Sequence, residues 1–330
     1  MNVIEARGLR KEFTVTKPAG RLRRSRETVP AVDGVDVAVE EGELLGYLGP
    51  NGAGKSTTMK MFTGVLTPTA GYLQVCGLEP VPQRTRLARR IGVVFGQRTQ
   101  LWWDLPLRES FELARHIWRV PAAEHAARLR LLRDRLDLDG FLDTPVRQLS
   151  LGQRMRGDLT VALLHAPRVL FLDEPTIGLD VVSKQAVRAF LTELRDAGDT
   201  TVVLTTHDLA DIERLCRRLV VIDHGRVVHD GTLADLHARY GSRRRVEVDF
   251  EVPVAVSFDM AGVSVESHAG DRVVFSIDGT VTTAGALVAR LSESGPIRDL
   301  RVTEPTIEDV VAQLYASPSA EAARAPEPRG

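Results

Sequence analysis

Residues 49–57 read Gly49-Pro50-Asn51-Gly52-Ala53-Gly54-Lys55-Ser56-Thr57, and this stretch decides the fold. It meets the pattern G-x-x-x-x-G-K-[ST] without a mismatch. Its glycines let successive backbone N–H groups converge on one point, and a helix expected over residues 56–64 adds the positive end of its dipole there. A strand-like run, Glu43–Leu48, precedes it. The context favours a phosphate-binding loop over a chance glycine-rich turn.

Two side chains of this loop suit a nucleotide. Lys55 supplies a mobile positive charge for the β- and γ-phosphates, and the Ser56 hydroxyl is a suitable ligand for Mg²⁺. We expect all nine residues of the loop to contact the nucleotide. The loop alone leaves open which process the phosphate energy drives.

Composition narrows the class of protein. The chain has 330 residues, of which 43% are hydrophobic and 26% charged, as in a globular protein with one large domain and a small one. A net charge of −1 argues against nucleic acid as a partner. The apolar runs are too short to cross a bilayer, and the N-terminus lacks the apolar core of a signal peptide. With only Cys76 and Cys216, both expected to be packing residues, a reducing cytoplasm is the natural compartment.

The hydrophobic pattern predicts an α/β fold up to about residue 240. Strand-like runs at 43–48, 91–95, 168–172, 200–205 and 219–223 alternate with helical patterns at 182–197 and 209–217. This alternation indicates a mostly parallel sheet covered by helices. Three- and four-residue apolar spacing predicts further helices over 105–142.

Two other regions differ from this pattern. The basic stretch 17–26 is interrupted by turn formers, and we expect either an exposed loop or a contact with anionic headgroups or an acidic partner loop. After Gly241, short alternating strands at 245–250, 254–258, 263–266, 272–277 and 297–302 and helices at 282–291 and 306–315 predict a small α+β domain. Thr306 and Asp309 form the expected N-cap pair of the last helix, and residues 317–330 are expected to be disordered.

A pair of carboxylates ends one buried strand, Arg168–Leu172, which runs directly into Asp173 and Glu174. Successive strand residues point to opposite sides, so the two should have different roles. Asp173 would hold Mg²⁺, and Glu174 would orient and polarise the attacking water as a general base. The alternative is a pair of exposed acids at a strand end.

The segment Leu149-Ser150-Leu151-Gly152-Gln153 opens a predicted helix and resembles the signature peptide L-S-G-G-Q of the ATP-binding cassette (ABC) family. Leu151 stands where the family has its first glycine, whereas Ser150, Gly152 and Gln153 match. The resemblance implies that these three residues bind the γ-phosphate of a nucleotide.

Further family marks follow at the expected places. The resemblance implies that Gln97 senses Mg²⁺ and the attacking water, and that His207 contacts the γ-phosphate. It also implies that Asp180 lies in the loop through which two cassettes communicate. Phe13 matches the aromatic residue that stacks on adenine, although a core phenylalanine would have the same sequence pattern.

The resemblance also implies the architecture. We expect an ABC-type P-loop domain over residues 1–240, with a mixed, mostly parallel sheet, an antiparallel β subdomain and a helical subdomain over about 98–160. An accessory α+β domain would span 241–316, followed by a disordered tail at 317–330. Each ATP would lie between the phosphate loop of one cassette and the signature of another, in a homodimer or a heterodimer with a related ATPase.

Within the family, a transporter ATPase fits better than the alternative, a soluble ATPase that acts on ribosomes or chromosomes. Those classes carry two cassettes or long coiled-coil insertions, and this chain has neither. Segments 96–106, 149–156 and 304–310 resemble type-2 exporters of the drug- and sodium-export group. We therefore expect a peripheral ATPase at the cytoplasmic face of the membrane that drives a permease on a separate chain. Trp102 and Trp103 would either pack inside the helical subdomain or line the cleft for a permease helix.

Overall fold

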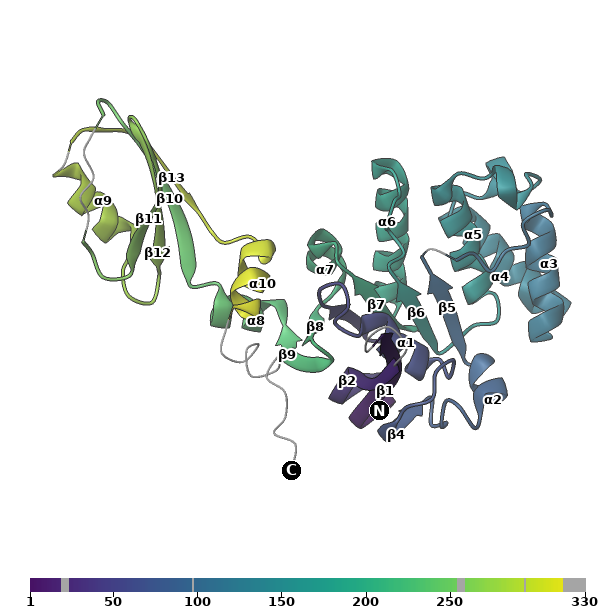
Figure 1. Ribbon diagram of the computed structural model, residues 1–330. Coiled ribbons are helices and arrows are strands. Elements are labelled where there is room, and N and C mark those ends of the chain that lie inside the picture. Colours follow the sequence, from purple (N-terminus) through teal and green to yellow (C-terminus); the bar gives the residue numbers. More distant parts are fainter. Residues whose placement is uncertain (19–23, 97, 254–258, 294, 317–330) are drawn as a thin grey trace. The chain divides into compact units, whose positions relative to one another are not determined.

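The computed structural model describes residues 1–18, 24–96, 98–253, 259–293 and 295–316 (Figure 1). Among these, the chain divides into two units, residues 1–230 and residues 231–316. The first unit contains two sheets and the second contains one, and each unit has its own hydrophobic core. The expected tail at 317–330, the expected strand at 254–258 and Gln97 lie outside the described residues.

A six-stranded sheet forms the centre of the first unit, in the order β5-β6-β7-β3-β8-β9. The pairs β5–β6, β6–β7, β7–β3 and β3–β8 are parallel, as expected. Every residue of β3 and β7 is buried, as in sheets covered on both faces. The strands are β3 Leu44–Leu48, β5 Ile91–Phe95, β6 Val169–Asp173, β7 Thr201–Thr206, β8 Arg218–Asp223 and β9 Arg226–Thr232.

Helices connect these parallel strands, because a parallel neighbour is reached only by a crossover. Helix α1 follows β3 through the phosphate loop, and α6 and α7 flank β7 in sequence. Their apolar faces supply core residues such as Met59, Phe190 and Ile212. The helices are α1 Lys55–Phe62, α2 Arg84–Ala88, α5 Leu151–Leu163, α6 Val181–Ala197 and α7 Leu209–Leu215.

A second, antiparallel sheet has the order β2-β1-β4, with β1 Asn2–Pro18, β2 Arg24–Glu40 and β4 Ala70–Val75. The β1–β2 pairing continues to Pro18 opposite Arg24. The expectation that the basic stretch 17–26 is a loop is therefore wrong at both of its ends. The β-branched residues Thr14 and Val15, which precede the stretch, pair with Thr28 and Glu27 and extend the ladder.

The helical segment is confirmed. It contains α3 Leu107–Trp118, α4 Ala122–Arg135 and two short 3₁₀ turns, η1 Asp139–Phe141 and η2 Val146–Gln148. Pro106 and Pro121 stand at the N-caps of α3 and α4. Leu107, Phe111 and Ala114 are buried as the spacing predicts, whereas Ile117, in the last turn of α3, is exposed.

The second unit contains an antiparallel sheet in the order β11-β12-β10-β13, whose apolar face packs against α9. This division starts ten residues before the boundary expected at 240, because α8 packs against α10. The expected capping box of Thr306 and Asp309 is confirmed at α10. The elements are α8 Leu233–Tyr240, β10 Arg243–Phe250, β11 Val263–Ala269, β12 Arg272–Asp278, α9 Ala284–Ser292, β13 Ile297–Thr303 and α10 Ile307–Tyr315.

Both cysteines are buried, as expected for packing residues. Burial raises the pKa of the Cys216 thiol, which therefore stays protonated. In the part of the chain that the structure describes, no helix combines the length and the apolar character that a membrane span requires.

The core of the first unit can be tested at Phe171, which is fully buried in β6 against the ring of Phe62. We expect Phe171→Ala to lower the free energy of unfolding by about 3–5 kcal/mol, because the cavity cannot collapse completely. All three tryptophans, Trp102, Trp103 and Trp118, lie in this unit, so their fluorescence during urea unfolding reports on it alone. The exposed Val65→Ala is the control, and an equal loss in both variants would contradict the prediction.

Candidate functional site

The phosphate loop joins β3 to α1, as predicted. Gly54 is the N-cap of α1 with φ +107°, and a Cβ there would lie 2.4 Å from the carbonyl oxygen of Ala31, so only glycine fits. The Lys55 ammonium folds back and donates to the carbonyl oxygens of Gly49 (2.6 Å) and Pro50 (3.1 Å). Burial lowers the pKa of Lys55, an effect that the carboxylates of Glu174 and Asp173 oppose. The lysine charge is thus held at the loop, facing two acids.

Asp173 and Ser56 meet beside this loop. The Ser56 hydroxyl donates to Asp173 Oδ1 at 3.2 Å, and the Thr205 hydroxyl of β7 donates to the same oxygen. Asp173 ends β6 while Ser56 lies in the first turn of α1. The fold therefore brings together a hydroxyl and a carboxylate from segments 117 residues apart.

Glu174 leaves the strand in a left-handed conformation, with φ +55°. The two acids are therefore separated by a turn in the backbone and not by the strand alternation that we expected. This conformation costs a non-glycine residue on the order of 1–3 kcal/mol and persists only where the surroundings enforce it. Two of the enforcing contacts are hydrogen bonds from the Glu174 N–H to Thr205 O (2.9 Å) and from the Ile177 N–H to Glu174 O (3.3 Å).

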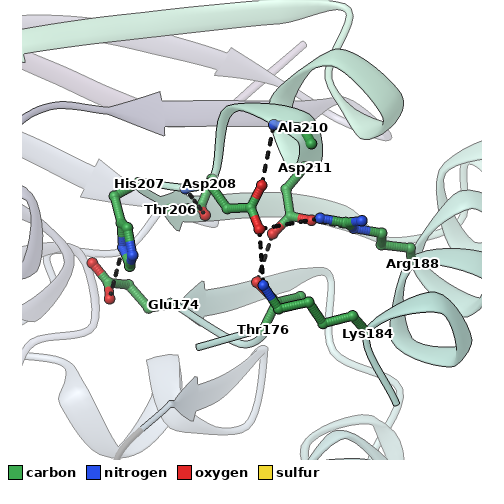
Figure 2. Close-up of polar contacts among 9 residues, drawn as sticks. All are labelled: Glu174, Thr176, Lys184, Arg188, Thr206, His207, Asp208, Ala210 and Asp211. Carbon is green, nitrogen blue, oxygen red and sulfur yellow. Dashed lines mark hydrogen bonds and ion pairs between the residues drawn. The ribbon is translucent and has the colours of Figure 1, made fainter. Parts of the chain in front are cut away.

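The turn directs the Glu174 carboxylate to His207. Figure 2 shows the pair, in which Nδ1 of His207 lies 3.2 Å from Oε2 of Glu174. His207 follows β7 directly and its side chain is about half exposed, whereas the Glu174 side chain is mostly covered. Two residues predicted to be catalytic are thus in contact at neighbouring strand ends.

The chain around Gly96 completes this side of the site. The Gly96 N–H donates to Asp173 O at 2.7 Å, and a Cβ at Gly96 would lie 2.2 Å from Glu174 O. Gln97, which we predicted to be catalytic and a metal ligand, comes next and lies outside the described residues. A cavity of about 430 Å³ opens here, lined by Asn51, Ser56, Lys60, Val65, Phe95, Gly96, Arg98, Asp173 and Glu174.

A buried carboxylate of α5 holds the segment that follows. Oδ1 of Asp158 accepts hydrogen bonds from the Thr99 hydroxyl and the Gln100 N–H, both at 2.9 Å. The next two N–H groups, of Leu101 and Trp102, donate to the side chains of Thr99 and Ser110. Burial raises the pKa of Asp158 to about 6 despite the two hydrogen bonds, which lower it.

The signature residues form a second group. Ser150 is the N-cap of α5, its hydroxyl accepts the Gln153 N–H (3.2 Å), and its own N–H donates to Gln153 Oε1 (2.9 Å). A Cβ at Gly152 would lie 2.0 Å from the hydroxyl oxygen of Ser183, so α5 begins directly against α6. The Leu151 side chain lies over Gly178, where an added Cβ would come within 3.1 Å of it.

Asp180 belongs to this second group. It caps α6 through Ser183, whose N–H and hydroxyl donate to its two carboxylate oxygens at 2.9 and 2.7 Å. These hydrogen bonds keep the pKa of Asp180 below its usual value. Among the described residues, no hydrogen bond of Ser150, Gln153 or Asp180 reaches the phosphate loop.

Phe13 lies in β1 opposite Val29, with the Lys11 ammonium 5.3 Å from the centre of its ring. Its side chain is 42% exposed, which rules out the alternative that it is a core residue. The ring is therefore open to stacking, and its contact with adenine stays a prediction.

Sequence reasoning missed several polar residues that support this site. Asp158 and Asp211 are buried acids on the apolar faces of α5 and α7, beside Leu159 and Ile212. An acid within an apolar stripe is a visible signal, since burial of a charge requires a partner. The identity of the partners could not be found in the same way, because Thr99 and Thr176 are distant in sequence.

Comparison with known proteins gives a consistent result. The sequence model of the family described as "ABC transporter" matches residues 32–177. Nod factor export ATP-binding protein I of Paraburkholderia xenovorans is 35% identical over 89% of this chain and 95% of its own length. Daunorubicin resistance ATP-binding protein DrrA3 of Streptomyces coeruleorubidus is 36% identical over 86% of this chain and 90% of its own length.

A solved structure agrees with these relatives. The ATP-binding cassette MJ0796, described as a dimer in a post-hydrolysis state bound to ADP and Pi, superposes with a TM-score of 0.59. It is 26% identical to this chain and the match covers 70% of this chain and 98% of that one.

The raised pKa of Asp158 makes a prediction about stability and pH. Between 3.8 and about 6 the unfolded chain has lost this proton and the folded chain keeps it, so the free energy of unfolding falls as pH rises through that window. From pH 5 to pH 8 we expect Asp158 to contribute a loss of about 1 kcal/mol. Asp158→Asn keeps the acceptor Oδ1 but has no proton to lose. Its stability relative to the wild type should therefore increase from pH 5 to pH 8 in urea titrations, and a constant difference would contradict the assignment.

Proposed function

This chain belongs to the ABC transporter family, and from that premise we propose that it is the ATP-hydrolysing subunit of an exporter and drives a permease on a separate polypeptide. The contact between Glu174 and His207, beside Ser56 and Asp173, carries the proposal of hydrolysis. This contact lies at the end of the sheet where the phosphate loop lies, which supports Glu174 as the proposed base and His207 as the proposed phosphate-binding group.

In the proposed reaction the Glu174 carboxylate accepts a proton from a water molecule. The oxygen of that water attacks the γ-phosphorus as the bond to the bridging oxygen breaks, and ADP and phosphate result. His207 and Lys55 would hold the γ-phosphate, and Gln97 would help to orient the water. The N–H groups of the loop from Gly49 to Thr57 would bind the other phosphates.

The donor set fits Mg²⁺. The ion prefers oxygen ligands and is held by few protein groups together with nucleotide phosphates. Ser56 and Asp173 offer such oxygens, and their hydrogen bond already brings them within 3.2 Å of each other. When bound, Mg²⁺ would neutralise the charge on the β- and γ-phosphates. We propose Ser56, Asp173 and Gln97 as the residues that hold it, directly or through water.

A second cassette would complete the site. Ser150, Gly152, Gln153 and Asp180 form a group whose hydrogen bonds do not reach the phosphate loop of the same chain within the described residues. We propose that they face the phosphate loop of a partner cassette, either a second copy or a related ATPase. The dimer reported for the similar cassette MJ0796 supports this arrangement.

The permease would contact the segment held by Asp158. Trp102 and Trp103 of this segment are 37% and 50% exposed, so they do not pack fully inside the helical segment. Large aromatic side chains with exposed area anchor interfaces well. We propose that they line the cleft for a helix of the permease, which would place the chain at the cytoplasmic face of the membrane. The names of the two relatives, one in Nod factor export and one in daunorubicin resistance, support export.

We expect Glu174→Gln to bind ATP with wild-type affinity and to lose turnover by at least about a hundredfold, because the amide cannot accept the proton of water. The variant should also accumulate as an ATP-bound dimer in size-exclusion chromatography. Phosphate release assays measure the loss directly. Normal ATPase activity in this variant would remove Glu174 from the role of base.

Lys55→Ala is the contrasting control. This substitution removes the charge that we propose to hold the phosphates, so ATP affinity itself should fall and no ATP-bound dimer should form. A variant with unchanged affinity would count against the phosphate loop as the binding site.

Purification of the tagged chain from membranes in mild detergent tests the transporter assignment. We expect a polypeptide with several membrane spans to copurify, and Trp103→Ala together with Trp102→Ala to reduce its yield. Recovery without any such partner would contradict the transporter proposal.

A further inference from the structure

A polar network joins the two loops that carry Glu174 and His207 (Figure 2). It is made by Thr176, on the loop after Glu174, by Asp208 and Asp211 at the start of α7, and by Lys184 and Arg188 on α6. None of these residues lines the cavity beside the phosphate loop.

The first half of the network supports the loop that follows Glu174. The Thr176 hydroxyl donates to Oδ2 of Asp211 at 2.6 Å, and Nε of Arg188 donates to Oδ1 of the same carboxylate. Asp211 is fully buried and Thr176 is 3% exposed. A buried carboxylate needs both partners, so the bond to Thr176 cannot be exchanged for one to water.

The second half lies behind His207. Arg188 and Lys184 both donate to Oδ2 of Asp208, at 3.2 and 3.1 Å. Oδ1 of Asp208 caps α7 through the Ala210 N–H, and its own N–H donates to the Thr206 hydroxyl. Burial raises the pKa of Asp208, but the hydrogen bond from Lys184 and the charges of Lys184 and Arg188 outweigh it, so that the pKa is lowered and the carboxylate stays charged.

The two halves close a ring. Thr176 is two residues after Glu174, Asp208 is the neighbour of His207, and the side chains of Glu174 and His207 touch at the front. Arg188 bridges the two acids at the back. The left-handed backbone at Glu174 therefore has a support from the far side, in addition to its bonds with Thr205 and Ile177.

We propose that the Thr176 hydroxyl, anchored on Asp211, is a positioning group for hydrolysis that fixes the Glu174 carboxylate against His207. Thr176 does not touch the nucleotide in this proposal, and it acts only through the direction in which the loop presents Glu174. The inference rests on the proposed function in one respect, the assignment of Glu174 as the base.

Thr176→Val and Thr176→Ser form the decisive pair. Valine has the shape of threonine without the donor, whereas serine keeps the donor and loses a methyl group. We expect kcat to fall about ten- to a hundredfold in Thr176→Val, since a small displacement of a catalytic group has effects of this size. In Thr176→Ser, kcat should stay within about twofold of the wild type. The affinity for ATP, measured by calorimetry, should be unchanged in both because the phosphate loop is intact.

Thr192→Val is the matched control for a lost hydroxyl. Thr192 lies on α6, is partly buried and donates to the backbone oxygen of Arg188 at 2.9 Å, whereas the ring uses only the Arg188 side chain. Its substitution should leave kcat within about twofold of the wild type. Melting temperatures of all variants show whether Thr176→Val is folded, and kcat is compared per folded molecule.

Three outcomes would overturn the inference. They are an unchanged kcat in Thr176→Val, an equal loss in Thr176→Ser, and an ATP affinity that falls in step with kcat. Glu174→Gln, assayed in parallel, keeps this result separate from the proposed function. If Glu174→Gln is inactive and Thr176→Val is normal, only the positioning role fails. If Glu174→Gln turns over normally, the assignment of Glu174 as the base fails, and the positioning role of Thr176 fails with it.

Discussion

The site depends on one constraint, the burial of both faces of the parallel sheet. Every residue of β3 and β7 is buried, so a polar side chain there, such as Thr205, needs a hydrogen-bond partner, and the charged groups of the site lie at the carboxyl ends of the strands. The phosphate loop follows β3, Gly96 follows β5, Asp173 ends β6, and His207 follows β7. Parallel pairing places these ends at one edge of the sheet. Residues more than a hundred positions apart therefore become neighbours because their strands pair, and not because of any feature of their local sequence.

The sequence predicted those features that depend on residues close together in the chain. The phosphate loop, the capping box at Thr306, the strands β3, β5, β6, β7 and β8, and the helices α6 and α7 follow from a few neighbouring residues. The left-handed turn at Glu174 could not be predicted, because nothing in Glu174 itself favours it and Thr205 and Ile177 enforce it. The strand pairing at the two ends of the basic stretch and the start of the second unit just before α8 likewise depend on distant partners. For the same reason the sequence shows Asp211 only as an acid within an apolar stripe of α7, and does not show its partner Thr176.

The two units differ in where their charged side chains lie. In the first, acids such as Asp158 and Asp211 are buried and each is bound by specific donors. In the second, one face of the antiparallel sheet is apolar and packs against α9, while the other carries charged pairs such as Arg272 with Asp249. Exposed pairs of that kind contribute little to stability. Buried acids with specific hydrogen-bond partners are therefore found in the unit with the phosphate loop.

The packing of Leu151 over Gly178 has a consequence for how such chains can change over generations. Gly178 has φ +71°, a conformation that asparagine also tolerates, but an added Cβ would lie 3.1 Å from Cδ2 of Leu151, so the leucine would have to shift by a few tenths of an ångström. A chain with glycine at 151 would have that space free. The two positions are therefore expected to vary together, with a large residue at 151 favouring glycine at 178 and a glycine at 151 leaving room for asparagine there as well. A substitution at position 151 of the signature would thus be accompanied by a change in the residues found at position 178, in the loop that leads to Asp180.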